Sequence, residues 1–510
     1  MILKRITVAV FIFLPVILHG STRGVVEINT RHFTVIYPAA VSDRAISITC
    51  KSEEVITSLI NFMQYEPPGR IILRISVPDK YMSVNGSFFY SLSPGSIEIE
   101  ALDYPGWEIN LSEIIFTRYM ELFARNFKGI PGINNLMHAG LMHYMIYGTD
   151  DKAAVMLNDL VANRNNGELR INASEYFNDG GNLSIAVFFW DYLASVFGRD
   201  AMAGALKDAA YFDGFFNALY TITDSDASAV DRGFRNYLSG HIKHGQALTS
   251  LPVEGFNYGA GDILAHCSLR EGEIYALISE SGGRYNLFYR LNGKAWHKIN
   301  MGHAEYRFTS VTACGDRIVV SGYDRYGSVL ICYDPGTGKK VREREFPLIY
   351  IDHIDADNAG ERIIFSAYTS GRYSLFVYNN DSVVILKTEG EGINLMYPAF
   401  TESGRILYVR KDAAESLMLF DEETVSSSEI YRTSNTLGRP CEDPAGNILY
   451  SETVNGVTDI RCLEKTGLSV RQLTAGSTSN IDPVYIMGRL YFLNYYLGGY
   501  RPASLLLNSK

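Results

Sequence analysis

The sequence predicts a multidomain protein in which an N-terminal α+β domain is followed by an all-β six-bladed β-propeller. With 510 residues, the chain is long enough for more than one domain. Its second half repeats a unit of short strands, whereas its first half alternates strand and helix patterns. A separate apolar stretch opens the chain. The predicted boundaries are 1–21 for a signal peptide, 22–247 for the α+β domain and 248–510 for the propeller.

Six segments of the second half share one plan: a turn that ends in glycine, an apolar strand, a short polar hairpin and a second strand. The segments are rich in Tyr, Val, Ile and Phe, which favours strands over the helices of other repeats of this length. A period of 42 to 45 residues with several short strands is typical of a four-stranded blade, so six repeats predict six blades. The marker glycines are Gly272, Gly315, Gly360, Gly404, Gly446 and Gly488.

The last repeat is incomplete. It ends at Lys510 and leaves room for about three strands of ordinary length. We expect the missing strand to come from residues 250–259, SLPVEGFNYG, just before the first repeat. Pairing of these two chain segments would close the ring of blades and remove its open edge.

Three turns, Asp357–Gly360, Glu402–Gly404 and Asp443–Gly446, precede the second strand of their repeats. They resemble the SPDG turn of the TolB-like, WD40-like propeller family, over roughly residues 255–510. The resemblance implies the propeller fold and leaves the function open, because propellers serve as enzymes, scaffolds and receptors.

Two histidines of the repeats are candidate binding residues. His266 and His353 fall on the expected innermost strands of two blades, where side chains line the central channel. The alternative for each is a hydrogen-bonded histidine within a strand. The segment DADNAG at 355–360 begins like a calcium loop but lacks the later ligands and the terminal Glu, so no calcium site is expected.

The first half shows alternating strand and helix signals. Ser52 is the expected N-cap of its first helix, and Asn110 or Ser112 that of the second. The expected strands are 32–38, 70–78 and 96–102, and the expected helices are 51–65, 110–127, 136–148, 180–206 and 228–241.

The order of these elements over about residues 25–245 resembles the gluzincin-like, or peptidase MA-like, metallopeptidase domain. In that family an HExxH helix supplies two histidine ligands and a general base for a zinc-bound water, and a following EGxAxY helix supplies a glutamate ligand. Gly140 and Tyr144 match the second motif.

The resemblance implies that this metal site is degenerate. Thr117 and Glu121 occupy the two histidine positions, Arg118 the position of the general base, and Ala139 that of the glutamate ligand. A hydroxyl, one carboxylate and a methyl group do not make a zinc site. We therefore expect an inactive peptidase homologue with no catalytic residue, metal or cofactor.

Other histidines offer a relocated metal site. His138 and His143 are five residues apart and point to different sides of a helix. His241 and His244 are three apart, which permits chelation, but no acid lies between them. The alternative for that pair is a solvated helix terminus, where histidine is favoured by the helix dipole.

The N-terminus and the charge suggest where the protein acts. MILKR and the apolar stretch at 6–18 are typical of a secretory signal, and the stretch is short for a membrane span. An uncleaved anchor is the alternative. We expect a periplasmic or cell-surface protein. The net charge of −10 without a basic block argues against nucleic acid as a partner, and six scattered cysteines argue against a disulfide scaffold.

The function predicted from the sequence is a non-catalytic envelope binding or scaffold protein. Its degenerate peptidase domain and propeller would recognise a protein, peptide or glycan. One alternative is a hydrolase with an unrecognised or relocated active site. The other is a structural module whose propeller spaces or docks the first domain. The sequence contains no GxSxG, P-loop or GxGxxG motif.

Overall fold

A computed structural model of the chain describes most of the sequence. The described residues are 24–77, 90–93, 96–127, 134–150, 153–158, 183–241, 251–252, 256 and 262–507, except 270–273, 282–283, 293, 303–305, 325, 358, 380–381, 455, 466–468, 476–478 and 497–498. The predicted signal peptide and the predicted boundary at 247/248 lie outside these residues, as do Gly272 and His244.

The chain divides into two compact units. One comprises Met1–Leu102 and Gly106–Gly129, and the other comprises Asp103–Pro105 and Ile130–Lys510.

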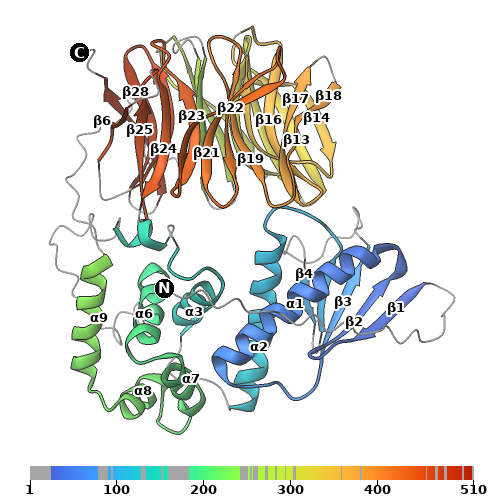
Figure 1. The fold of residues 1–510 in the computed structure, drawn as a ribbon, viewed down its shortest axis with the longest axis vertical. Helices are drawn as coiled ribbons and strands as arrows, with labels where there is room; N and C mark the ends of the chain where they lie inside the picture. The colour runs from blue at the N-terminus through green and yellow to red at the C-terminus, as the bar shows by residue number, and fades with distance from the viewer. Residues whose placement is uncertain are drawn as a thin grey trace. The chain divides into compact units, whose positions relative to one another are not determined.

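The first unit contains a five-stranded mixed sheet with the order β1-β2-β3-β5-β4 (Figure 1). The central pairs β2–β3 and β3–β5 are parallel, while both edge strands pair antiparallel. Helices α1 and α2 pack against each other and against strands of this sheet. The bounds are β1 Val25–Asn29, β2 Phe33–Pro38, η1 Ala39–Val41, α1 Ser42–Met63, β3 Ile71–Ser76, β4 Tyr90–Ser93, β5 Ser96–Glu100 and α2 Trp107–Asn126.

The predicted starts of both helices are wrong. Helix α1 begins at Ser42, so Ser52 lies in its interior, where the buried Ser52 Oγ donates to the Ile48 carbonyl oxygen at 2.7 Å. Helix α2 has Gly106 at its N-cap, and Ser112 Oγ likewise donates one turn back, to Glu108. A serine inside a helix can satisfy its hydroxyl by donating to the carbonyl oxygen of the preceding turn. Serine therefore also occurs within helices, and the predicted N-caps were wrong for this reason.

A helical region precedes the propeller. The predicted single helix at 180–206 is wrong, because Gly198, with φ 84° and ψ 158°, separates α6 from α7. Helices α3 and α6 pack closely: a Cβ on Gly140 would lie 2.5 Å from the Ala186 Cβ. The bounds are α3 Asn135–Tyr147, α6 Leu183–Val196, α7 Arg199–Asp208, α8 Phe215–Thr223 and α9 Ala227–His241.

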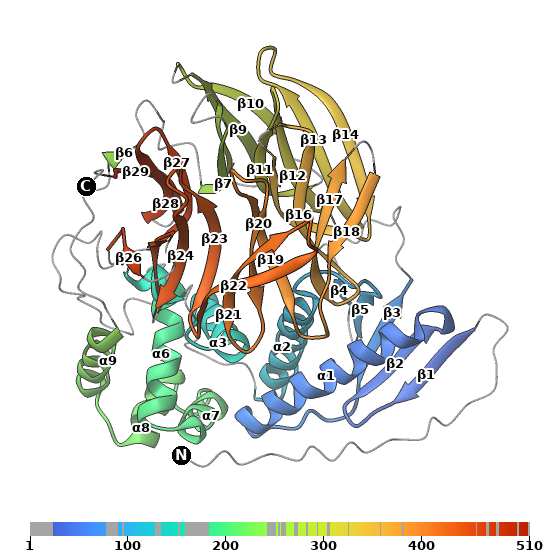
Figure 2. The same ribbon diagram turned by 45° about the horizontal axis from the view of Figure 1, so that its top comes forward.

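The propeller has six four-stranded antiparallel sheets, which confirms the six predicted blades (Figures 1 and 2). Blades 1 to 3 are β7 Asp262–Leu269, β8 Ile274–Ser281, β9 Arg284–Leu291, β10 His297–Gly302; β11 Arg307–Cys314, β12 Arg317–Asp324, β13 Gly327–Asp334, β14 Lys339–Pro347; and β15 Tyr350–Ala356, β16 Arg362–Thr369, β17 Arg372–Asn379, β18 Ser382–Lys387. Blades 4 to 6 are β19 Asn394–Phe400, β20 Ile406–Lys411, β21 Glu415–Asp421, β22 Ser426–Thr433; β23 Thr436–Glu442, β24 Ile448–Val454, β25 Val457–Leu463, β26 Val470–Gln472; and β27 Asn480–Ile486, β28 Arg489–Tyr496, β29 Gly499–Leu506, β6 Leu251–Pro252.

Strand β6 completes the last blade. It pairs antiparallel with β29, with Pro252 opposite Ala503 and Leu251 opposite Ser504. The expectation that residues before the first repeat close the ring is therefore confirmed, and the closure protects the β29 edge.

The five marker glycines that the structure describes occupy the turns between the first and second strands of their blades. Gly360 N donates to the Asp357 carbonyl oxygen, and Asp357 Oδ1 accepts from the N–H of Glu361. The φ of Gly360 is +70°, and a Cβ there would lie 2.1 Å from the backbone N of Gly315 in the neighbouring blade. This turn thus requires glycine for both its conformation and its packing.

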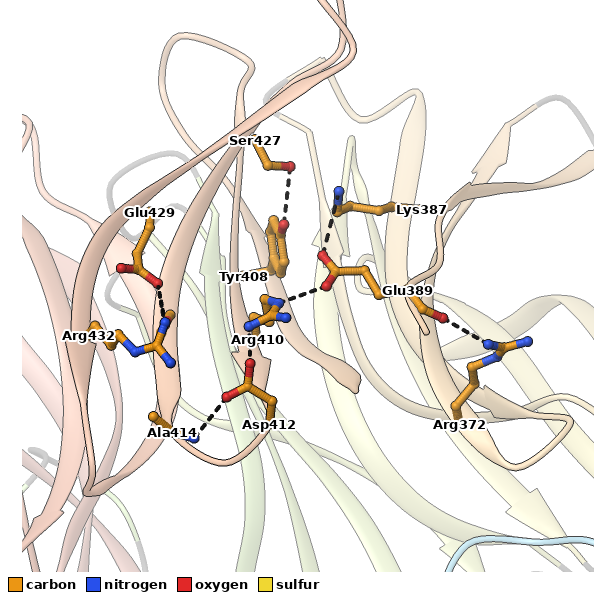
Figure 3. A network of polar contacts seen from close by, with 11 residues as sticks. Arg372, Lys387, Glu389, Tyr408, Arg410, Asp412, Ala414, Ser427, Glu429 and Arg432 are labelled. Atoms are coloured by element: carbon orange, nitrogen blue, oxygen red, sulfur yellow. Dashed lines mark hydrogen bonds and ion pairs between the residues drawn. The ribbon is translucent and has the colours of Figure 1, made fainter. Parts of the chain in front are cut away.

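A polar network joins blades 3 and 4 (Figure 3). Glu389, in the connection after β18, accepts a hydrogen bond from Arg410 Nε of β20 at 2.7 Å and lies 3.7 Å from Lys387 Nζ. Arg410 also pairs with Asp412, and Arg372 Nη1 donates to the Glu389 carbonyl oxygen at 2.8 Å. These contacts fix the connection between the two blades.

Candidate functional site

The innermost strands of the six blades, β7, β11, β15, β19, β23 and β27, neighbour one another around the propeller axis. Each contains an irregularity in its pairing with the second strand of its blade. Such bulges re-aim side chains and often lie beside binding sites. The breaks lie between Ile263 and Ala265, Phe308 and Ser310, Ile351 and His353, Met396 and Ala399, Leu437 and Pro440, and Ile481 and Val484.

The bulge of blade 5 places Arg439 near the axis. The residue is only 5% exposed. Its Nη1 donates to the His266 carbonyl oxygen of blade 1 at 3.1 Å, and its Nη2 lies 3.6 Å from Asp355 Oδ1 of blade 3. One side chain therefore links three alternate blades.

Arg439 and Asp355 also line a cavity of about 350 Å³. Its walls come from the ends of the innermost strands of blades 2 to 6 and the turns that follow. The charged side chains of the lining are three carboxylates and one guanidinium. The other lining side chains are small, aliphatic, polar or aromatic. The lining residues are Thr312, Ala313, Asp355, Ala356, Ala399, Phe400, Thr401, Glu402, Arg439, Pro440, Cys441, Glu442, Pro444, Pro483, Val484 and Tyr485.

Two of the three carboxylates of the cavity, those of Asp355 and Glu442, accept hydrogen bonds from backbone donors. Asp355 Oδ2 accepts from the N–H of Phe400 at 2.8 Å, and Glu442 Oε2 accepts from the N–H of Glu402 at 2.7 Å. Burial raises the pKa of Asp355, while the charge of Arg439 and the bond from Phe400 act in the opposite direction. The cavity is thus a preformed, predominantly acidic pocket.

His266 is a hydrogen-bonded histidine within a strand, which was the alternative to a binding residue. It is fully buried, and its Nε2 lies 2.5 Å from the Asp482 carbonyl oxygen, to which it must donate. Its Nδ1 then accepts from the Tyr275 hydroxyl at 2.9 Å. Burial lowers the pKa of His266 to about 3, so the ring is neutral near pH 7.

His353 differs from His266. It is 6% exposed, and its ring meets the Tyr397 ring edge-on at 5.5 Å between centroids. Its Nε2 is buried and has no hydrogen-bond partner among the described residues. Burial, reinforced by Arg439, holds the pKa of His353 well below its usual range. Neither histidine belongs to the lining of the cavity.

Two further aspartates occupy bulges of the innermost strands. Asp482 has a φ of 53° in β27, and burial raises its pKa. Burial also raises the pKa of Asp352 to about 6; Asp482 adds to this effect, and Lys411 and Arg307 oppose it.

The sequence reasoning missed Arg439, Asp352, Asp355 and Asp482. One available signal was a proline inside three expected innermost strands, directly after Tyr397, Arg439 and Asp482. A proline within an internal strand indicates a bulge, because it cannot donate to the ladder.

The residues at the degenerate peptidase positions lie on α2 and α3, which belong to different compact units. On α2, Thr117 Oγ1 donates to the Glu113 carbonyl oxygen at 2.9 Å. Arg118 is buried, and its Nη1 donates to Glu121 Oε2 at 2.7 Å. Ala139 is half-buried on α3. The peptidase alignment itself stays a prediction.

The candidate histidines for a relocated metal site make other contacts. His143 Nε2 lies 3.2 Å from Asp150 Oδ1, and His241 Nδ1 donates to the Tyr237 carbonyl oxygen at 2.9 Å. Burial lowers the pKa of His138. Within the described ranges, no three His, Cys, Asp or Glu side chains are grouped so as to hold a metal.

The cysteines form no disulfide in the structure. All six cysteines are free. Of the helices in the described part of the chain, none is both long and apolar enough to cross a membrane.

No protein-family model and no curated protein matches this sequence. Among solved structures, TolB from Acinetobacter baumannii is similar with 14% identity and a TM-score of 0.37, over 48% of this chain and 57% of that one. The chain thus matches little more than half of that TolB. The β-propeller domain of Cps50 (Swd1) from Myceliophteria thermophila is similar with 14% identity and a TM-score of 0.36, over 48% and 83% of the two chains. The chain contains a six-bladed β-propeller with TolB among its structural neighbours, and this assignment rests on the strand order of its blades.

Proposed function

We propose that this chain is a non-catalytic binding or scaffold protein whose propeller cavity receives part of a protein, peptide or glycan partner. The observation that carries the proposal is the cavity of about 350 Å³ on the inner strands of five blades. Strands of five different sheets form its walls, so its shape exists before any partner binds. Preformed pockets of this size are typical of sites that recognise a small group or a short segment.

The protonation states of Cys441, which lines the cavity, and of His266 and His353 nearby on the innermost strands support a non-catalytic role for these three side chains. Burial raises the pKa of the Cys441 thiol to about 12, so it stays protonated. His266 and His353 have lowered pKa values and stay neutral. A general base works best with a pKa near the working pH, and a nucleophilic thiol must ionise.

The N-terminal half enters the proposal as an inactive relative of metallopeptidases. The ion pair of Arg118 and Glu121 supports this, because a guanidinium stands where the metallopeptidase motif has its general base. The apolar stretch at residues 6–18 supports secretion across a membrane, to the periplasm or the cell surface.

A cavity-blocking variant tests the proposal. Pro444 lies exposed on the cavity lining, whereas the next residue, Ala445, is exposed in the same turn but is not part of the lining. The chain from residue 22 onward is used to capture partners from envelope extracts, identified by mass spectrometry. We expect Pro444→Trp to lose partners that the wild type and Ala445→Trp both retain. Equal capture by all three proteins would refute the role of the cavity, and turnover of peptides or glycans by the wild type would refute the non-catalytic assignment.

A further inference from the structure

We propose that β18, the outermost strand of blade 3, pairs edge to edge with the same strand of a second copy of this chain. The two strands run antiparallel about a two-fold axis through Val384 and join two blades into one continuous sheet. The strand contributes no residue to the lining of the cavity, so the inference goes beyond the proposed function and does not rest on it.

The outer edge of β18 offers backbone groups for pairing. The strand is the last in the order β15-β16-β17-β18 and lies at the outer rim of its blade (Figures 1 and 2). Its pairing with β17 starts at the hairpin, with Asn379 opposite Ser382. Because backbone groups alternate in direction from such a pair onward, the N–H and C=O groups of Val383 and Ile385 point away from β17. In the described part of the chain, no strand pairs with this edge.

The side chains of this edge are apolar and exposed. Val384 is 60% and Ile385 58% exposed, and no residue from Ser382 to Leu386 carries a charge. The outermost strands β10, β14, β22 and β26 all contain charged residues, which discourage pairing with another chain. An uncharged, apolar outer edge is therefore the feature that sets β18 apart from these four strands.

Two-fold symmetry fits this sequence. With Val384 on the axis, it faces the partner's Val384, and Val383 lies opposite the partner's Ile385. Val383 and Ile385 are the two residues whose backbone groups point outward, so they can exchange hydrogen bonds across the axis. Every side chain in this register meets an apolar one, and Lys387 stays outside the central pairs. A foreign strand would need a matching apolar run, whereas a second copy always carries one.

The longer edge of the neighbouring blade excludes the same arrangement. Strand β14 has nine residues, and all those from Lys339 to Glu345 are exposed. Its centre reads Arg342, Glu343, Arg344, so whichever of them lies on a two-fold axis faces its own charge. Like charges directly opposite each other destabilise a strand pair. The edge with more backbone groups is thus protected from self-pairing by its charges, and β18 is not.

Sedimentation velocity of the chain from residue 22 onward, over a range of concentrations, tests the inference. Added salt screens the repulsion between two chains of net charge −10. One strand per partner is a small interface, so we expect a weak dimer that grows with concentration. Val384→Lys places two ammonium groups opposite each other and should raise the dissociation constant about tenfold or more. Val341→Lys is the matched control, because this valine is 52% exposed on β14 and the variant adds the same charge.

A disulfide test reports the register directly. Both cysteine variants are made in the background Cys50→Ser, because Cys50 is an exposed thiol. Under mild oxidation we expect Val384→Cys to form a covalent dimer, since the two thiols meet on the axis, and Val341→Cys to stay monomeric. A wild type that is monomeric at every concentration would overturn the inference, and this is the result expected if the edge serves a strand of another protein. Equal weakening by the two lysine variants, or equal cross-linking of the two cysteine variants, would also overturn it.

Discussion

Arg439 Nη1 donates a hydrogen bond of 3.1 Å to the backbone carbonyl of His266, a residue 173 positions earlier in the chain. The bond joins the innermost strands of blades 5 and 1, and the same guanidinium lies beside Asp355 of blade 3. A buried positive charge thus stabilises the region between blades in which burial raises the pKa values of Asp355 and Asp482.

Removal of Arg439 should destabilise the propeller. In Arg439→Met the carboxylates of Asp355 and Asp482 lose their buried counter-charge and the His266 carbonyl loses its donor. We expect a loss of about 3 kcal/mol in the free energy of unfolding, measured by urea denaturation. Arg405→Met, at an exposed position of the propeller, should change it by less than about 0.5 kcal/mol. Similar losses in the two variants would contradict the role of Arg439.

The close approach of two blade turns should make Gly360 irreplaceable. Alanine there places a Cβ 2.1 Å from the Gly315 nitrogen, a backbone atom that cannot move aside. Gly404 has a similar φ of 79°, but a Cβ there meets nothing within 4 Å. Gly404→Ala should lower the free energy of unfolding by about 1–2 kcal/mol, through conformational strain alone. Gly360→Ala should lower it by about 2 kcal/mol more, because the added Cβ overpacks the contact between the two turns. Thermal unfolding compares the two, and equal costs would contradict the clash.

Gly140 should be required for helix packing. Replacing an interior helical glycine by alanine usually stabilises a protein by about 0.5–1 kcal/mol. We expect Gly240→Ala, in the last turn of α9, to stabilise the protein by at most this amount, because a Cβ there meets no atom within 4 Å. For Gly140→Ala we expect the free energy of unfolding to fall by about 1–3 kcal/mol instead, because the Cβ collides with Ala186. Adding Ala186→Gly to this variant should restore part of the lost stability. A gain in Gly140→Ala would show that α3 and α6 are not so close.

Buried titratable groups near the axis should give the stability a composite dependence on pH. The pKa of His266 falls from 6.5 to about 3 on folding, so the unfolded chain binds more protons and stability is lost as pH falls below about 6.5. The pKa of Asp352 rises from 3.8 to about 6, so the folded chain binds more protons and stability is gained as pH falls through 6.

Single variants should separate these opposed effects. Between pH 7 and pH 5 we expect His266→Gln to lose about 2 kcal/mol less stability than the wild type, and Asp352→Asn to lose about 1 kcal/mol more. Urea denaturation at both pH values checks this. Identical pH dependence in the wild type and His266→Gln would mean that the histidine is not kept neutral by the fold.

The blade repeat was predictable because the residues that specify each blade lie close together in the sequence. The intervals between glycines, the alternation of apolar residues and the turn chemistry together define six blades, and the incomplete last repeat predicted the closing strand at β6. Helix starts were less predictable, since Ser52 and Ser112 bond to the preceding turn rather than cap an end.

The sequence by itself therefore determined the number of blades and their four-strand plan, because these depend on neighbours within one repeat, and the incomplete last repeat indicated that a strand from before the first repeat closes the ring. The cavity was decided by the tertiary structure alone. Asp355, Glu402, Arg439 and Glu442 come from three different repeats, and none belongs to a motif. Closure of the ring and the bulges of the innermost strands bring them together, and burial sets their charge states. Burial and proximity arise only when distant segments pack, so no local pattern in the sequence records them.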